Sequence, residues 1–285
     1  SPRGLDCCGA DSAPLDTDER VKELGLADEL TRGVAGYRAL MHHKYVIRDR
    51  EHVWTGSLNL TDDSMSRQEN LIVRLQSGKL ADLYTRDFTQ LWDTERIDVS
   101  HAFDTDPDTL LFDGAPAPTD VDFSPVQGEQ INEWVAGKVM RARRRIVICS
   151  MLINSSKLLR ALTAQLDRGE IDLWGVYDGT QMEGVLDQWR EIPELDWKIE
   201  AVRRVVREGG LVGKRSRPYR PNDVHDFMHN KTLVVDDTVI TGSYNLSHAA
   251  RDNAENMLAI ESLALAERVV AYTRHLADRY DGRGD

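Results

Sequence analysis

One polar motif occurs twice in this sequence, and it contains the side chains that could carry out a reaction. The first copy begins with His42 and Lys44, and the second begins with His229 and Lys231. A repeat of this kind indicates two related structural units. In order, the motif residues are His42, Lys44, Asp49, Gly56, Ser57 and Asn59 in the first copy, and His229, Lys231, Asp236, Gly242, Ser243 and Asn245 in the second.

These residue types together suit a reaction at a phosphodiester. One imidazole can attack an electrophile while a second donates a proton to the leaving group. Two lysine ammonium groups supply positive charge where negative charge develops, and serine hydroxyls and asparagine amides add neutral hydrogen-bond donors. If both copies converge on one cleft, they form a site for an anion with two ester arms.

The doubled motif resembles the signature of the phospholipase D superfamily, H-x-K-x(4)-D-x(6)-G-S-x-N. The first copy matches at every signature position, and the second is one residue shorter before Gly242. We expect this deletion to shorten a turn between two strands and to leave the chemistry in place. The resemblance implies a metal-independent phosphodiesterase that forms a covalent phosphohistidine and needs no cofactor.

The resemblance also implies roles for the four basic residues of the motif. It makes His42 the nucleophile and His229 the acid that protonates the leaving alcohol, although the sequence itself does not order the two. Lys44 and Lys231 are expected to hold the phosphoryl oxygens. No spacing typical of a zinc site occurs among the histidines and cysteines, so we predict no metal ligands.

Two glutamates lie at matching distances from the two motifs. Glu69 follows Ser57 by twelve residues, and Glu255 follows Ser243 by twelve residues. By resemblance they are the carboxylates that orient the histidine rings and hold the useful tautomer. The alternative is that each is a half-buried carboxylate at the edge of a strand.

The remaining motif residues are expected to bind phosphate or to shape the backbone. Hydrogen bonds to the phosphate are predicted for Ser57, Asn59, Ser243 and Asn245; the alternative is a turn that only shapes the chain. The turn itself is assigned to Gly56 and Gly242. Asp49 and Asp236 are expected to be structural partners away from the phosphate.

The bulk composition indicates a soluble globular protein rather than a general nucleic-acid coat protein. The 285 residues carry a formal net charge of −12, with 41% hydrophobic and 29% charged residues. Non-specific nucleic-acid binding needs many basic groups, although a local basic cleft stays possible. No apolar run is long enough to span a bilayer, so any membrane contact would be peripheral. Three cysteines form no disulfide framework, which favours a reducing, cytoplasmic location.

Alternating strand and helix patterns predict an α/β fold with two pseudo-symmetric α-β-α halves that share one active site. We expect an N-terminal arm and helix over 1–33, the C-terminal part of a first half over 34–95, a linker over 96–120 and a second half over 121–285. Far fewer residues precede His42 than precede His229 within its half, so the first half is expected to be incomplete. Its exposed sheet edge would then favour a homodimer.

A basic segment precedes the second motif. Residues 203–220 hold seven Arg or Lys residues and one acidic residue, Glu208, together with three Gly and one Pro. We expect an extended stretch over 197–202 followed by a loop at the rim of the site that attracts polyanions. The alternative is a solvated, flexible loop.

The resemblance implies a phosphodiesterase, and the prevalence of lipid enzymes in the family favours one that hydrolyses, or transfers between alcohols, the headgroup esters of phospholipids. The first alternative is an endonuclease that cleaves DNA or RNA. The second is a non-catalytic module that binds polyanions, and the intact histidines and lysines of both motifs count against it.

Overall fold

The structure is a computed structural model that describes residues 22–26, 30–36, 39–220 and 223–282. The predicted N-terminal arm lies outside the described residues. So does half of the helix expected at the end of that segment, over 16–33. Of its described residues, 22 and 23 are helical and those after residue 23 form a turn and irregular chain.

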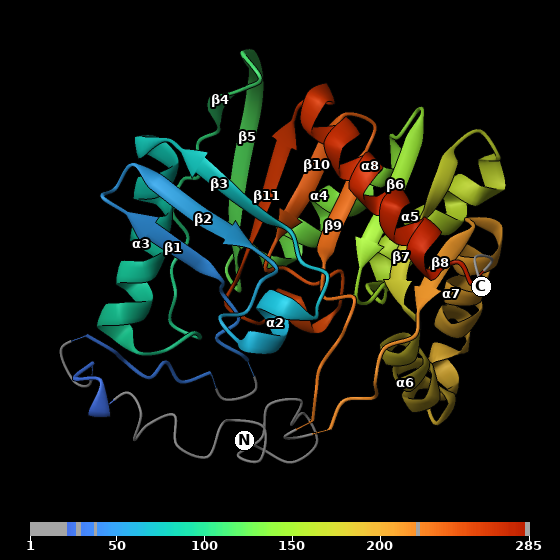
Figure 1. Cartoon of the computed structure of the whole chain (residues 1–285), viewed down its shortest axis with the longest axis horizontal. Helices are drawn as coiled ribbons and strands as arrows, with labels where there is room; N and C mark the ends of the chain where they lie inside the picture. Colours follow the sequence, from blue (N-terminus) through green and yellow to red (C-terminus); the bar gives the residue numbers. More distant parts are fainter. Residues whose placement is uncertain (1–21, 27–29, 37–38, 221–222, 283–285) are drawn as a thin grey trace.

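The strands form two sheets, seen side by side in Figure 1. The smaller sheet is antiparallel and contains β1 (Tyr45–Arg48), β2 (His52–Gly56) and β3 (Ile72–Gln76). The larger sheet has eight strands in the order β4-β5-β11-β10-β9-β6-β7-β8, and its β6, β7 and β8 are mutually parallel. Its strands are β4 (Asp108–Phe112), β5 (Ala115–Ser124), β6 (Arg145–Ser150), β7 (Asp172–Asp178), β8 (Leu211–Lys214), β9 (Lys231–Val235), β10 (Thr238–Gly242) and β11 (Glu255–Glu261).

Helices cover both faces of the larger sheet and one face of the smaller. In Figure 1, α8 (Leu263–Tyr280) crosses the front of the larger sheet, while α4 (Gly128–Met140) and α5 (Ser156–Arg168) lie behind it. The smaller sheet packs on α3 (Gly78–Thr94). The other helices are α2 (Asp62–Ser66), α6 (Gly179–Arg190) and α7 (Asp196–Glu208), with short 3-10 turns at Pro193–Leu195 and Ala249–Arg251.

The sequence repeat is also a structural repeat. Strands β1-β2-β3 followed by α3 correspond to β9-β10-β11 followed by α8, and each helix begins at a serine whose side chain accepts a backbone N–H. In the first hairpin Arg48 pairs with His52, whereas in the second Val235 pairs with Thr238. The second hairpin loop is therefore one residue shorter, which confirms the predicted effect of the deletion.

The two halves share a core but differ in how their sheets are covered. A cluster that includes Val53 and Leu75 from the small sheet continues into Phe123 and Leu258 of the large sheet. On the other face, Leu233, Ile240 and Met257 of the second half are buried beneath α4 and α5. At the positions that correspond to them, the side chains of Val46, Trp54 and Ile72 are 53%, 53% and 42% exposed.

The predicted mixed α/β fold is confirmed, but three local predictions need correction. The expected linker over 96–120 contains β4 and the first part of β5, at one edge of the large sheet. Residues 197–202, expected to be extended, belong to helix α7, because Ile199, Val202 and Val205 form an apolar stripe at helical spacing. The expected loop over 203–220 holds the end of α7 and all of β8, and residues 215–220 are irregular.

We predict that Gly56→Ala destabilises the protein by about 1–3 kcal/mol, the usual cost of a strained backbone. Gly56 has φ 153°, and an added Cβ would lie 2.1 Å from the Leu71 carbonyl oxygen. Chemical denaturation measures the effect. Gly184→Ala in α6 is the control, because nothing lies within 4 Å of its added Cβ and alanine favours a helix. A Gly56→Ala protein as stable as the control would contradict the assigned turn geometry.

Candidate active site

The first histidine is held at the boundary between the halves. The backbone N–H of His42 donates to the Ala254 carbonyl at 3.0 Å, and the Ala254 N–H donates to the Leu40 carbonyl at 2.9 Å. The His42 Nδ1 atom lies 2.6 Å from Oε2 of Glu255, which is fully buried at the start of β11. A carboxylate of the second half therefore orients the imidazole of the first.

The second histidine is held in a corresponding way, but by an amide. The Glu69 N–H donates to the Phe227 carbonyl at 3.2 Å, which mirrors the bond between Ala254 and Leu40. The His229 Nδ1 atom lies 3.1 Å from Oδ1 of Asn70. The Asn70 amide is itself fixed, since its Oδ1 accepts from the Ser57 hydroxyl and its Nδ2 donates to the Ser64 carbonyl.

The structural counterpart of Glu255 is therefore Asn70, which corrects the prediction for Glu69. Strand pairing makes this clear, since the Ser57 N–H donates to the Leu71 carbonyl and the Ser243 N–H donates to the Asn256 carbonyl. The first copy thus has one extra residue between its serine and the residue that contacts histidine. That residue lies in a segment that forms helix α2 in the first half and only a 3-10 turn in the second. Counting from the serines could not detect this shift.

Both lysines fold back on the histidines of their own motifs. The Lys44 Nζ donates to the His42 carbonyl at 2.7 Å, and the Lys231 Nζ donates to the His229 carbonyl at 3.0 Å. The Lys231 Nζ also lies 3.3 Å from the His229 Nε2. A donor at this position is compatible with a neutral His229 ring that is protonated on Nδ1 and has its Nε2 lone pair free.

The four basic groups form one electrostatic cluster. Burial lowers the pKa of His42, Glu255 opposes this shift, and Lys44 and Lys231 add to it. Burial, and then Lys231, Lys44 and His42, hold the pKa of His229 well below its usual value. Burial and Lys44 likewise hold the pKa of Lys231 well below its usual value. Charged groups shift one another's pKa values only at short range, so the four basic groups lie close together. The two motifs therefore converge on one place.

The repeated pattern of glycine and serine builds the turn that follows each hairpin. Gly56 and Gly242 have φ values of 153° and 141°, and an added Cβ would come within 2.3 Å or less of a carbonyl oxygen of the neighbouring strand. Ser57 and Ser243 are fully buried, and their hydroxyls accept the backbone N–H groups of Leu71 and Asn256. Both serine hydroxyls are thus engaged in holding the adjacent strand.

Asn245 and the two motif aspartates have different surroundings. Asn245 has a buried Oδ1 atom without a hydrogen-bond partner, which is unusual for a buried polar group. Asp49 is an exposed loop residue, and its carboxylate accepts from Arg48. The carboxylate of Asp236 accepts the backbone N–H groups of residues 143–145. Both aspartates lie in hairpin loops rather than beside the histidines.

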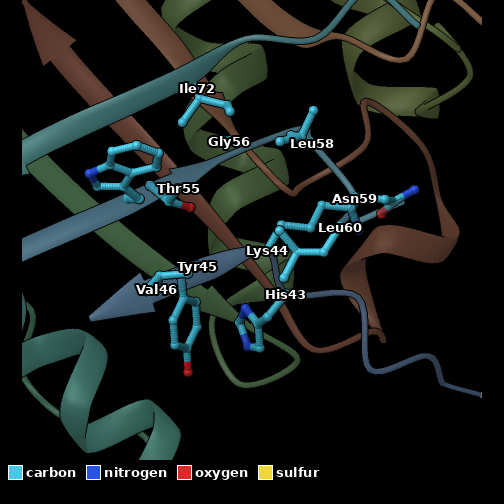
Figure 2. Close-up of a pocket in the computed structure, with 11 residues that line it drawn as sticks. His43, Lys44, Tyr45, Val46, Thr55, Gly56, Leu58, Asn59, Leu60 and Ile72 are labelled. Carbon is cyan, nitrogen blue, oxygen red and sulfur yellow. The ribbon is translucent and has the colours of Figure 1, made fainter. Parts of the chain in front are cut away.

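A cavity of about 300 Å³ lies next to the first motif, on the outer face of the small sheet (Figure 2). Lys44 and Asn59 contribute to its lining. The rest of the lining is largely apolar and includes the exposed side chains of Val46, Trp54 and Ile72. The motif therefore adjoins an apolar surface.

Several residues that the sequence analysis did not single out hold the segments that carry the histidines and lysines of the cluster. The Asn256 Oδ1 accepts from the Thr55 hydroxyl at 2.8 Å and from the Tyr84 hydroxyl at 3.1 Å. The side chain of His43 is buried, with its Nε2 3.0 Å from Oδ2 of Asp87. The bonds of Asn256 join the first half to β11, and only the fold reveals these contacts.

Most of the basic segment is paired within the protein. Five of its seven cations form ion pairs, and Lys214 is buried against Glu69. The prediction of a free basic loop at the rim therefore applies at most to residues 215–220. The paired cations are Arg204, Arg207, Lys214, Arg215 and Arg217.

The described residues contain neither a candidate membrane-spanning helix nor a candidate metal-binding cluster. In this part of the chain, no helix is both long and apolar enough to cross a bilayer. Nor do three or more His, Cys, Asp or Glu side chains in these ranges gather in a way that could hold a metal ion.

Comparison with known proteins shows to which family the chain belongs. Residues 14–92 and 136–277, well over half of the chain, match the family described as cardiolipin synthase, PLD-like domain. The chain belongs to this phospholipase D-like family. Membership confirms the resemblance predicted from the doubled motif, and it supports an enzyme of phosphodiester chemistry. No curated protein matches the sequence of the phospholipase D-like chain.

The chain is also similar to solved structures. Phosphatidylserine synthase from Haemophilus influenzae Rd KW20 is similar with a TM-score of 0.61 and 15% identity, over 92% of this chain and 67% of that one. Nuc from Salmonella typhimurium, a phospholipase D family member, is similar with a TM-score of 0.40 and 22% identity, over 57% of this chain and 95% of that one. The first of these similarities supports a phospholipase D-like fold.

We predict that the free energy of unfolding falls as the pH is lowered from about 7.5 to about 5.5. The pKa of His229 is well below its usual value in the folded protein and returns to about 6.5 on unfolding. The unfolded chain therefore takes up more protons in this range, and stability present above about pH 6.5 is lost below it. Denaturation of the wild type and of His229→Gln at several pH values measures the contribution.

The His229→Gln protein should lose less stability over this pH range than the wild type. His101→Gln, which changes an exposed histidine, serves as the control and should follow the wild type. Identical pH dependence in His229→Gln and the wild type would contradict the assigned burial of an uncharged His229.

Proposed function

We propose that this protein is a phosphodiesterase that acts through a covalent phosphohistidine and needs no metal. The observation that carries the proposal is the cluster of His42, His229, Lys44 and Lys231 at the boundary between the halves. It combines two imidazoles with two cations, which is what an in-line displacement at an anionic phosphorus requires.

The two histidines receive different roles because their partners differ. His42 contacts the carboxylate of Glu255, which can stabilise the positive charge of a phosphorylated imidazole. His229 contacts the neutral amide of Asn70, and its low pKa makes its protonated form a strong acid. A bound phosphodiester anion would favour that protonated form. We therefore assign His42 as the nucleophile and His229 as the general acid.

The proposed reaction has two balanced steps. In the first, His42 Nε2 attacks phosphorus, a P–N bond forms, and the P–O bond to the leaving alcohol breaks as His229 gives that oxygen its proton. In the second, water attacks phosphorus, His229 takes a proton from the water, and the P–N bond breaks. An acceptor alcohol in place of water would give transfer of the phosphatidyl group rather than hydrolysis.

Other motif residues receive supporting roles in this mechanism. Lys44 and Lys231 would bind the non-bridging oxygens, and Asn59 and Asn245 would add amide contacts. The orphaned Oδ1 of Asn245 supports this role, since a flipped amide would present a donor to the phosphate. Ser57 and Ser243 would act mainly by holding the strands that carry Asn70 and Glu255.

A phospholipid is the proposed substrate. The net charge of −12 and the internal pairing of the basic segment give a nucleic acid little to bind. The apolar cavity beside Lys44 would accept the hydrocarbon part of a lipid (Figure 2). The names of the matching family and of the similar solved structure, cardiolipin synthase and phosphatidylserine synthase, also point to phospholipids.

A side-by-side assay tests both the chemistry and the substrate class. Wild type, His42→Ala and the surface control His101→Gln are incubated with vesicles of phosphatidylcholine and phosphatidylglycerol, and separately with single-stranded DNA. We expect headgroup release by the wild type and the control, and a loss on the order of 10³-fold or more in His42→Ala.

Three results would count against parts of this proposal. Cleavage of DNA but not of lipid would exclude the phospholipid and retain the phosphodiesterase. Equal activity of His42→Ala and wild type would exclude the phosphohistidine. Binding of polyanions without turnover of either substrate would favour a non-catalytic module.

A further inference from the structure

Glu69 takes part in a buried ion pair that the proposed reaction does not use. Its Oε2 accepts from the Nζ of Lys214 and its Oε1 accepts from the hydroxyl of Tyr280, while Arg279 Nη1 lies 3.9 Å away. The Glu69 and Lys214 side chains are only 8% and 7% exposed. The pair links the first half to the end of β8 and to the last residue of α8 in the second half.

The pair exists on one side of the structural repeat only. The residue that corresponds to Glu69 in the second half is Ala254, which has no charge to place. A buried ion pair contributes little net stability compared with apolar residues, and it can instead specify one arrangement of the chain. The Glu69 pair is therefore a candidate for a positioning device that acts on one histidine alone.

Glu69 is directly connected to the surroundings of His229. The next residue, Asn70, contacts the His229 ring at 3.1 Å, and the Glu69 N–H donates to the carbonyl of Phe227, two residues before His229. Movement of Glu69 would shift the amide that fixes the ring and the chain that carries it.

Lys214 is connected to the same segment from the other side. Two residues later, the Ser216 hydroxyl donates to Oδ1 of Asp178 at 2.7 Å. The Oδ2 of Asp178 accepts the backbone N–H of Met228, the residue before His229, at 2.9 Å. The ion pair thus connects the two segments, one next to Glu69 and one next to Lys214, that hold the chain around His229 in place.

We propose that the Glu69–Lys214 ion pair is a positioning pair for His229. It holds Asn70 where its Oδ1 keeps the His229 ring in one orientation, protonated on Nδ1 with Nε2 directed at the substrate. The proposal rests on the function proposed above, in which His229 is the proton donor, and it concerns neither substrate binding nor the nucleophile.

The leaving group distinguishes a misplaced proton donor from general damage. An alkyl leaving group needs a proton from His229, whereas p-nitrophenolate leaves without one. In Glu69→Gln we expect kcat for the vesicle phospholipid to fall about 10²-fold with KM unchanged, the size of effect that a small misplacement produces. We expect the rate of the p-nitrophenolate burst from bis(p-nitrophenyl) phosphate, which reports the first step alone, to change by no more than about threefold. His229→Gln should show the same selectivity with a larger loss.

Two further variants separate positioning from loss of stability. Glu69→Gln leaves Lys214 buried without its partner, whereas the double variant Glu69→Gln with Lys214→Met removes both charges. The double variant should regain thermal stability and keep the selective defect. Glu267→Gln, which removes the acceptor of Arg145 on α8, is the control and should behave as the wild type.

A spectroscopic measurement tests the pair without any activity. The ¹⁵N shifts of the His229 ring, assigned by comparison with His229→Gln, should report a single Nδ1-protonated tautomer in the wild type. They should report a mixture in Glu69→Gln. An unchanged tautomer, or equal slowing of lipid cleavage and of the p-nitrophenolate burst, would overturn the proposal. Absence of any ester hydrolysis by the wild type would instead refute the proposed function, and the tautomer would still decide the pair.

Discussion

Two imidazoles and two ammonium groups lie together where the halves of this protein meet, with His229 and Lys231 buried and His42 and Lys44 half-buried, and the rest of the structure depends on keeping them there. Burial of cationic groups is costly, and the lowered pKa values of His42, His229 and Lys231 reflect that cost. Glu255 offsets part of it from one side. A phosphodiester anion would offset more, so the site has a built-in preference for such a ligand.

The fold provides this arrangement through two hairpins that approach each other with the same hydrogen bonds. The chain before each histidine pairs with the chain before the residue that orients the opposite ring. The ring of each histidine is therefore oriented by a residue of the opposite half, and both halves are needed for the shared site. The buried Asn256, with its bonds to Thr55 and Tyr84, fixes the two halves in this relation.

Much of this organisation could be predicted from the sequence, because the motif spacing directly encodes strand, turn and strand. Helix α5 is marked in the sequence by a clear apolar period and by Gly169, which directly follows its last residue, Arg168. The sequence could not show that Asn70, rather than Glu69, contacts the His229 ring. That assignment depends on strand register rather than on residue counts. Helix α7 was missed because its β-branched residues suggested a strand, while its packing on the large sheet favours a helix.

The basic segment illustrates a similar limit. A run of arginines and lysines shows charge, but not which charges are already compensated within the fold. Lys214 is the clearest case, since it lies in a segment that suggested polyanion binding and instead forms a buried pair with Glu69. The distinction rests on tertiary contacts between residues far apart in the chain, which composition does not contain.

The most direct measurement of the central idea is a crystal structure of the protein with bound vanadate, an analogue of the pentacoordinate phosphoryl group. A shared site predicts one vanadium atom between the two rings, with His42 Nε2 and His229 Nε2 on opposite sides and both lysines on its oxygens. Vanadate bound to one histidine alone, or the two rings in separate pockets, would contradict it.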